Sequence, residues 1–490
     1  MDKKASGTQN IFRATGIHWL IFLSLVLLIK AGVFFLDHLP KFFLGDSATY
    51  IRTALTGWIP PDRSFVYGFL LGLIAVPARS LTPLLLLQVC LSALSAVILS
   101  YILIRVLGIR PVVGFAMGLL CALEPMQLLY ERFILTPSTA LFVFALYMLL
   151  IFLYLRHVRL LLLPAIQLVA VVLISLRMSY FPLFLIMTVI LPFLVLPKPG
   201  PVPSATLSSG RTVLRKPVFF RSRAGLLLLH LLLSLGSAYL LTLGYKHVNG
   251  HLSGKPPALQ YEAGFFLLAD FSPLIQPEDF PRPGLRDKVF GTLEFDLRER
   301  KFRGKHRWMP GGLVHNVKEA IPDPLEAEKA ARTTVLNAFK RKPFEFLLLS
   351  LKSWRDHLDA HYLQRFMVGD LGGSRFTDEY LDMLKKTFSL DSDYAPRAKT
   401  LTGAYFFHTR LWIQGLLFLP FLALFTIFIC GKTIRPPAFM LFIATSAIIC
   451  TSVTLMDSPC MRYIMPAAWM SFIIFGILID SLFRIRKTRL

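Results

Sequence analysis

A short polar stretch follows the first long apolar segment of the chain, and it contains residue types that could do chemistry. Residues 44–54 read Leu-Gly-Asp-Ser-Ala-Thr-Tyr-Ile-Arg-Thr-Ala, so Asp46, Tyr50 and Ala54 recur every four residues. That spacing places all three on one face of a helix. Asp46 is an acid at the point where the chain should leave a membrane, and a positioned carboxylate can act as a general base. We therefore treat the rest of the chain as the scaffold that holds this acid at a membrane surface.

The composition is that of a polytopic membrane protein. Of the 490 residues 55% are apolar, and many apolar runs approach the ~20 residues that span a bilayer. The five cysteines form no C-x-x-C pair, so the sequence indicates neither a disulfide framework nor a zinc site. The net charge is +24, but residues 245–408 hold 25 Lys and Arg against 21 Asp and Glu. The excess therefore lies in the membrane part, and no nucleic-acid motif accompanies it.

Ten apolar runs predict an all-α fold with about ten transmembrane helices. The runs cover residues 17–36, 83–104, 111–129, 133–155, 160–176, 179–196, 224–243, 409–430, 436–455 and 463–483. The loop 197–223 carries six basic residues and no acid, which marks it as cytoplasmic, and the tail 484–489 is also basic. Both termini are then expected in the cytoplasm and the loop 37–82 outside. Within that loop, the apolar run 65–76 is short enough to be an interfacial or re-entrant helix.

The chain is expected to have three parts. Residues 1–244 form an N-terminal transmembrane module, residues 245–408 an α-rich extracytoplasmic insert, and residues 409–490 a C-terminal transmembrane module. The most legible part of the insert, residues 325–358, predicts amphipathic helices broken at Pro343. These helices would lie either on the outer leaflet or in the core of an ordinary small domain.

Ionisable residues outside the insert gather on one side of this topology. Eight acids lie outside the insert, and six of them map to the extracytoplasmic ends of spans or to extracytoplasmic loops. Of these six, we interpret Asp37 and Asp62 as ordinary loop charges. Charge at membrane depth is costly, so such a cluster is a candidate site. An arginine fork suits phosphate oxygens, although each arginine could simply pair with a neighbouring acid. The candidates are the acids Asp46, Glu131 and Asp457 and the arginines Arg132, Arg177 and Arg462.

Several short motifs in this order resemble those of GT-C glycosyltransferases, of the kind related to dolichyl-phosphate-mannose–protein mannosyltransferases. The motifs are Gly45-Asp46-Ser47-x-x-Tyr50-x-x-x-Ala54, Arg63-Ser-Phe-Val-Tyr67-Gly68, Glu131-Arg-Phe-Ile-Leu-Thr136-Pro137-Ser138, Arg177 at an outer span end, and Arg462-Tyr463-x-x-Pro466. The resemblance covers residues 15–200, is thin over 455–470 and is absent from the insert. Ser47 stands where the protein mannosyltransferases have a second acid, which argues against protein as the acceptor. Met178 replaces a proline after Arg177, and no Glu precedes Arg462.

The resemblance implies a GT-C fold and an inverting transfer of a sugar from a polyprenyl-phosphate donor to a glycan or lipid acceptor. Asp46 would be the general base. We expect this chain in a bacterial cytoplasmic (inner) membrane with the site facing the periplasm, among membrane lipids and without nucleic acid, and composition alone also fits an endoplasmic-reticulum protein. We expect no cofactor and no obligatory metal, and leave a divalent metal open. The residues expected to bind substrate or donor are Tyr50, Arg63, Tyr67, Glu131, Arg132, Arg177, Asp457, Arg462 and Tyr463.

Two other function classes fit the same sequence. A polysaccharide polymerase or O-antigen ligase would use polyprenyl-pyrophosphate donors with arginine and histidine. The insert histidines that keep this alternative open are His247, His251, His306, His315, His357 and His361. A lipid or solute transporter would place charge at the bilayer midplane and often show repeated halves, neither of which the sequence indicates.

Overall fold

The computed structural model describes residues 15–43, 45–195, 223–371, 377–390, 400–431, 434–454 and 459–489. Every regular element in this part of the chain is a helix, apart from an isolated bridge between Lys41 and Phe133. The all-α expectation is therefore confirmed for the described residues. Asp457 and the basic loop 197–222 lie outside them.

Six helices are long and apolar enough to cross a membrane. They confirm an all-α chain with membrane-spanning character, and each overlaps one of the expected spans. They are α1 (Gly16–Leu36), α4 (Thr82–Tyr101, continued by the π-helical turn η2, Ile102–Val106), α7 (Pro137–His157), α10 (Arg223–Ser253), α22 (Arg435–Thr454) and α23 (Met461–Arg489).

The other apolar segments are shorter or bent. α20 (Arg410–Leu416) and α21 (Leu419–Ile429) are long enough to span only as a pair, and the pair is bent by 57°. The shorter helices are α5 (Pro111–Ala122), α8 (Leu162–Leu176) and α9 (Phe181–Leu194), which follows the turn η3 (Met178–Tyr180). The count of ten spans therefore remains a prediction.

The expected span 111–129 divides because a proline begins a new helix inside it. Pro125 opens α6 (Pro125–Tyr130), where a missing N–H is tolerated. The side chain of Glu124 caps that helix by accepting a hydrogen bond from the N–H of Gln127 at 2.8 Å. Glu124 itself has an extended backbone, so α5 and α6 are separate helices.

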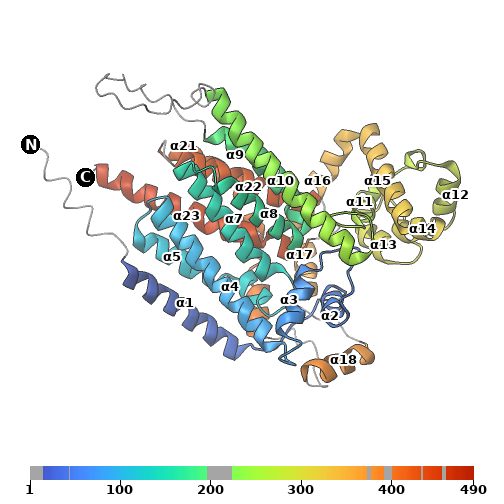
Figure 1. Cartoon of the computed structure of the whole chain (residues 1–490), viewed down its shortest axis with the longest axis horizontal. Coiled ribbons are helices and arrows are strands. Elements are labelled where there is room, and N and C mark those ends of the chain that lie inside the picture. Colours follow the sequence, from blue (N-terminus) through green and yellow to red (C-terminus); the bar gives the residue numbers. More distant parts are fainter. Residues whose placement is uncertain are drawn as a thin grey trace, which may run out of the picture.

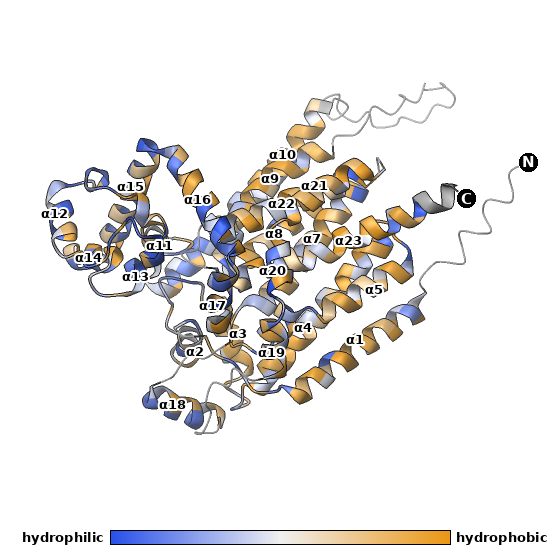
Figure 2. Cartoon of the chain, turned by 180° about the vertical axis from the view of Figure 1, so that it is seen from behind, coloured by the Kyte–Doolittle hydropathy of each residue, from blue (hydrophilic) through white to orange (hydrophobic). Residues whose placement is uncertain are grey.

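The apolar helices pack side by side, and the polar elements gather beyond one end of them. In Figure 1, α1 begins and α23 ends at the left, whereas α2 (Asp46–Thr56), α3 (Val66–Ile74) and the helices of the insert lie at the right. Figure 2 shows the apolar colours on the spans and the hydrophilic colours on the insert. The insert and its flank contain α11 (Ala263–Asp270), α12 (Pro283–Gly291), α13 (Arg303–Trp308), α14 (Leu313–Ala320), α15 (Pro324–Arg341), α16 (Pro343–Leu358), α17 (Ala360–Asp370), α18 (Asp378–Phe388) and α19 (Leu401–Phe407), with the short turns η5 (Ser272–Leu274), η6 (Pro277–Asp279) and η7 (Arg300–Phe302).

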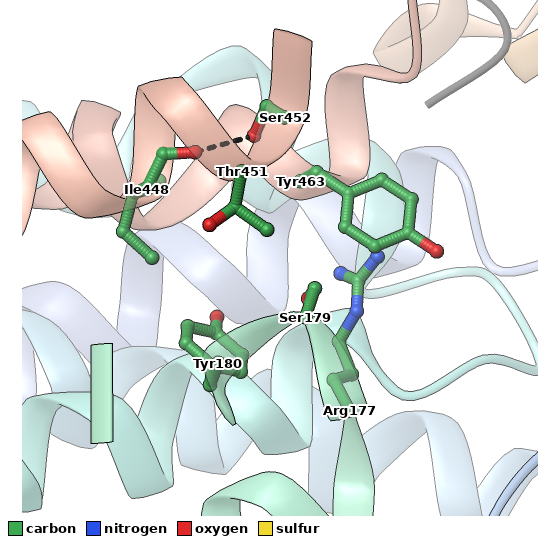
Figure 3. A pocket seen from close by; sticks show the side chains of 7 residues that line it. All are labelled: Arg177, Ser179, Tyr180, Ile448, Thr451, Ser452 and Tyr463. Atoms are coloured by element: carbon green, nitrogen blue, oxygen red, sulfur yellow. Dashed lines mark hydrogen bonds between the residues drawn. The ribbon is translucent and has the colours of Figure 1, made fainter. Parts of the chain in front are cut away.

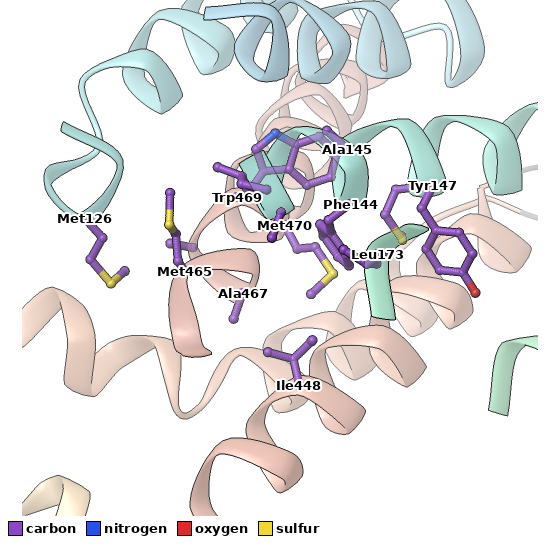
Figure 4. Close-up of a cluster of buried hydrophobic side chains, with 14 of the residues drawn as sticks. Met126, Phe144, Ala145, Tyr147, Leu173, Ile448, Met465, Ala467, Trp469 and Met470 are labelled. Atoms are coloured by element: carbon purple, nitrogen blue, oxygen red, sulfur yellow. The ribbon is translucent and has the colours of Figure 1, made fainter. Parts of the chain in front are cut away.

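Two hydrophobic cores stabilise these parts. In the core of the spans, Trp469 packs edge-on against Phe144 with ring centroids 5.8 Å apart, and its indole N–H donates to the carbonyl of Ser95 (Figure 4). The second core joins α11 to α16 and includes Phe265, Val317 and Phe346. Residues of α17, α18 and α19 belong to the first core, although they fall in the expected insert. The C-terminal part of the insert thus packs on the spans.

Candidate active site

Asp46 is the first residue of α2 (Asp46–Thr56), and the local sequence fixes where that helix begins and ends. Gly45 precedes it at φ 76°, and Gly57 ends it at φ 69° in the left-handed region that glycine tolerates. A carboxylate in the first turn is favoured by the helix dipole. Asp46 is therefore held at a helix start, outside the apolar spans.

Close packing against α3 (Val66–Ile74) sets the orientation of α2. A Cβ atom on Gly68 would lie 2.5 Å from the Cβ atom of Thr53, so a larger residue at 68 would push the helices apart. Gly72 approaches the carbonyl of Ala54 in the same way, at 3.1 Å from its added Cβ. α3 is too short to span a bilayer, in agreement with the expected short helix at 65–76.

Two arginines from distant parts of the chain bind the Asp46 carboxylate. Arg63 Nη1 lies 2.6 Å from Asp46 Oδ1, and Arg462 Nη1 lies 2.6 Å from Asp46 Oδ2. The Asp46 side chain is 21% exposed, and the arginine side chains are 16% and 13% exposed. This ion-pair cluster, which we call the Asp46 cluster (Asp46, Arg63 and Arg462), is therefore partly open to solvent.

The electrostatics of this cluster keep Asp46 ionised. Burial raises the pKa of Asp46, but the charges of Arg462 and Arg63 outweigh it and hold the pKa below its ordinary value. Burial is also the main reason why the pKa of Tyr50 rises to about 12, so Tyr50 keeps its proton. Asp62 accepts a hydrogen bond from Arg63 Nε at 2.9 Å and supports that arginine from the other side.

Arg177 joins the cluster through the backbone that carries Arg462. Its Nη1 donates to the carbonyl of Arg462 at 2.7 Å, and its guanidinium lies 4.1 Å from the ring centroid of Tyr463. Figure 3 shows this guanidinium beside the Tyr463 ring at one side of a small hollow. The other residues that line the hollow are Ser179, Tyr180, Ile448, Thr451 and Ser452. Arg177 thus lies next to hydroxyl-bearing side chains and contacts the backbone of Arg462.

Aromatic rings lie next to Arg63 and Arg462. The guanidinium of Arg63 lies 5.7 Å from the centroid of the Tyr50 ring, and the Tyr50 and Tyr67 rings meet edge-on at 4.9 Å. The hydroxyl of Tyr67 donates to Gln88 Oε1 at 2.9 Å. Arg462 in turn lies 4.4 Å from the centroid of the Phe43 ring.

Glu131 and Arg132 lie in a separate, fully buried cluster. Glu131 Oε1 accepts a hydrogen bond from Lys30 of α1, and Arg132 Nη1 lies 3.5 Å from Glu131 Oε2. Lys30 also donates to Ser92 Oγ at 3.1 Å, while Arg132 Nε donates to the carbonyl of Asp37 at 2.5 Å. This Lys30 cluster (Lys30, Glu131 and Arg132) joins α1 to α4 and to the end of α6.

The structure also shows contacts that the sequence reading did not include. Gln88 links the Lys30 cluster to the aromatic rings beside the Asp46 cluster, because its Nε2 donates to the carbonyls of Glu131 and Phe133 at 3.1 and 3.0 Å while its Oε1 accepts from Tyr67. Lys30 and Gln88 are polar residues inside expected spans, and that alone could have marked them. The positions of Phe43, Ser179 and Thr451 beside the arginines could not be predicted from the sequence in this way.

Asp37 belongs to a further hydrogen-bonded group of polar residues outside the Asp46 cluster. Its Oδ2 lies 3.1 Å from Lys41 Nζ and accepts hydrogen bonds from the N–H of Thr402 at 3.2 Å and from its hydroxyl at 2.5 Å. These bonds fasten the segment after α1 to α19. Across the described ranges, no three His, Cys, Asp or Glu side chains gather as a metal site would require.

Comparisons with known proteins found no match to a family model, a curated protein or a solved structure. The geometry of the described residues therefore carries the functional argument.

Proposed function

We propose that this protein is an integral membrane glycosyltransferase that moves a sugar from a polyprenyl-phosphate donor to an extracytoplasmic glycan or lipid acceptor. The observation that carries the proposal is the meeting of Asp46 with Arg63, Arg462 and, next to them, Arg177, from four separate segments at one end of the apolar helices. A carboxylate paired with two guanidinium groups, with a third arginine bound to the backbone of one of them, provides a base and an anion site together. The proposal includes a GT-C-like fold of about ten spans in a bacterial cytoplasmic membrane, with the site facing the periplasm.

The proposed reaction is an inverting displacement. The acceptor hydroxyl oxygen forms a bond to the anomeric carbon as its proton passes to an Asp46 oxygen. The bond from that carbon to the phosphate oxygen breaks, and the electron pair leaves with the polyprenyl phosphate. Charge grows on the departing phosphate, where Arg462 and Arg177 would stabilise it.

The exchange of an arginine from Asp46 to the donor phosphate would make Asp46 a stronger base for this step. Its two carboxylate oxygens are each held by a guanidinium group, and this lowers its basicity. A donor phosphate attracts the same forks, and arginine binds phosphate in the same bidentate geometry. When Arg462 turns to the phosphate, Asp46 loses one positive neighbour and becomes a better base next to the acceptor.

Three of the six histidines that would serve a pyrophosphate-using polymerase or ligase have side-chain contacts within the insert. His306 lies 3.4 Å from the carbonyl oxygen of Asp296, His357 lies 2.8 Å from that of Ser353, and His315 pairs with Glu319. Arg63 and Arg462, by contrast, pair with the Asp46 carboxylate. This arrangement favours the monophosphate-donor proposal.

The test compares purified wild type with Asp46→Asn in nanodiscs. Each would receive a panel of polyprenyl-phosphate sugars and an extract of glycan and lipid acceptors, with release of polyprenyl phosphate as the readout. We expect release by wild type and a loss of about 10²–10⁴-fold in the variant, with donor binding retained, because a positioned base contributes that much.

Asp287→Asn is the matched control, since Asp287 is an exposed aspartate of the insert that pairs only locally with Arg286 at 2.7 Å. It should release polyprenyl phosphate as wild type does. Equal release from Asp46→Asn and wild type would remove Asp46 from the chemistry. Release from pyrophosphate donors alone would replace the proposal with the polymerase or ligase class.

A further inference from the structure

α16 carries large apolar side chains on two opposite faces. Phe346 and Leu349 are buried in the core of the insert, and Ser353 and His357 continue that buried face. The α16 apolar row, by which we mean Phe344, Leu347, Leu348 and Leu351, is exposed, with exposed fractions of 80%, 58%, 52% and 53%. Leu347, Leu348 and Leu351 follow Phe344 by three, four and seven residues, which places the row along one side of the helix. A folded chain that left this row in water would expose a continuous apolar strip.

α16 also lies against the apolar helices rather than out in the polar part of the insert. Its Trp354 ring meets Phe418 edge-on at 5.3 Å, and its C-terminal carbonyl at Leu358 accepts a hydrogen bond from Gln414 Nε2 at 2.7 Å. Gln414 belongs to α20, and Phe418 lies at the bend between α20 and α21. In Figures 1 and 2, α16 runs across the direction of α1 and α10 and joins the insert to the spans.

Basic side chains border the apolar row. Lys340 precedes the row and is exposed, Lys352 flanks it, and Arg355 continues it by one turn at its C-terminal end. Lys342 pairs with Glu345 at 2.9 Å beside the start of the row. Long basic side chains at the edge of an apolar strip can place their charges among lipid phosphates while their stems stay in apolar surroundings.

We infer that the α16 apolar row is seated in the outer leaflet of the bilayer, so that the insert rests on lipid beside the spans. The row enters the acyl-chain boundary, and Lys340, Lys352 and Arg355 contact lipid phosphates. This anchor holds the insert by a membrane contact as well as by its packing on α20–α21. The inference needs the membrane character of the chain and, for the choice of the outer leaflet, the topology proposed above, but not the proposed activity.

The experiment places a tryptophan on each of two exposed leucines of the insert. Leu347→Trp tests the row, and Leu325→Trp is the matched control, because Leu325 is exposed at the start of α15 and outside the row. Each full-length variant is reconstituted in nanodiscs of equal parts phosphatidylcholine and phosphatidylglycerol, with and without bromine on the acyl chains. The emission of the six native tryptophans, measured in wild type, is subtracted.

Acyl-chain bromine should quench the added emission of Leu347→Trp at least about twice as strongly as that of Leu325→Trp, since quenching requires contact with the lipid tails. Leu351→Trp, one turn further along the row, should behave like Leu347→Trp. Equal, weak quenching at 347 and 325 would place the row in water and overturn the inference. Protection of position 347 only when two copies share one nanodisc would assign the row to a second copy and overturn it as well.

Discussion

The Asp46 cluster and the Lys30 cluster have nearly the same composition but different surroundings. Each holds one acid between two basic side chains that come from different segments. The side chains of Lys30, Glu131 and Arg132 are fully buried, whereas those of Asp46, Arg63 and Arg462 are 13–21% exposed. The same kind of ion pairing can therefore serve as a permanent joint in one place and as an exchangeable contact in the other.

The difference follows from the solvation of the partners. A fully buried acid that loses its partner has no water to replace it, so the Lys30 cluster is costly to open. A partly exposed acid can exchange a guanidinium for water or a ligand at small cost. We accordingly interpret the Lys30 cluster as structural and the Asp46 cluster as the place where a charged ligand binds.

The largest expected effect is the loss of the buried lysine. Lys30→Met leaves the Glu131 carboxylate without its closest partner, and we expect a loss of about 3–5 kcal/mol in the free energy of unfolding. Asp46→Asn should change it by less than about 1 kcal/mol, because that pair is partly exposed. Thermal unfolding of each variant in nanodiscs measures both values.

Leu28→Met on the same helix is the control, since Leu28 is exposed and its replacement should leave stability unchanged. The double variant Lys30→Met, Glu131→Gln should recover part of the loss, because it also removes the unpaired carboxylate. Equal destabilisation by Lys30→Met and Asp46→Asn would show that the two clusters do not differ in the way proposed.

A smaller effect is expected at Gln88, which links the Lys30 cluster to the aromatic rings beside the Asp46 cluster. Gln88→Leu leaves the buried hydroxyl of Tyr67 and the carbonyls of Glu131 and Phe133 without their partner, which should cost about 1–3 kcal/mol. Tyr67→Phe removes one of these bonds, so the loss in the double variant should be smaller than the sum of the single losses. Additive losses would mean that Gln88 does not hold Tyr67.

The sequence predicted the parts of this molecule that depend on local composition. Apolar length identified the helices that can span a membrane, and the spacing of Asp46 and Tyr50 placed both on one helix. The position of Asp46 at a span end, together with Arg63, Arg177 and Arg462, also indicated which side chains gather on one side. These features are local, or follow from the alternation of spans across a membrane.

The pairing of Asp46 with Arg462 could not be predicted, because it joins distant segments. Arg462 lies 416 residues after Asp46, and no pattern in the sequence says that the two are in contact, whereas the contact of Arg132 with Glu131 is one between adjacent residues. The break at Pro125 was visible as a proline, but the apolar run on both sides favoured a continuous span. Lys30 was missed because the surrounding run is strongly apolar and a single lysine changes its mean hydropathy little.

The smallest expected effect is a shift in pH dependence rather than a loss. The charges of Arg462 and Arg63 hold the pKa of Asp46 below its ordinary value, so the acid limb of kcat/KM for the donor should lie below about pH 3.9, the ordinary pKa of an aspartate. Arg63→Gln removes one of the two charges that favour the ionised carboxylate, and the limb should move to higher pH. Arg52→Gln is the control, on the helix that begins at Asp46, since Arg52 is exposed and its guanidinium lies 4.4 Å from the centroid of the Trp58 ring. A limb that stays in place in Arg63→Gln would show that Asp46 does not set it, and would locate the titrating base elsewhere on this face of the protein.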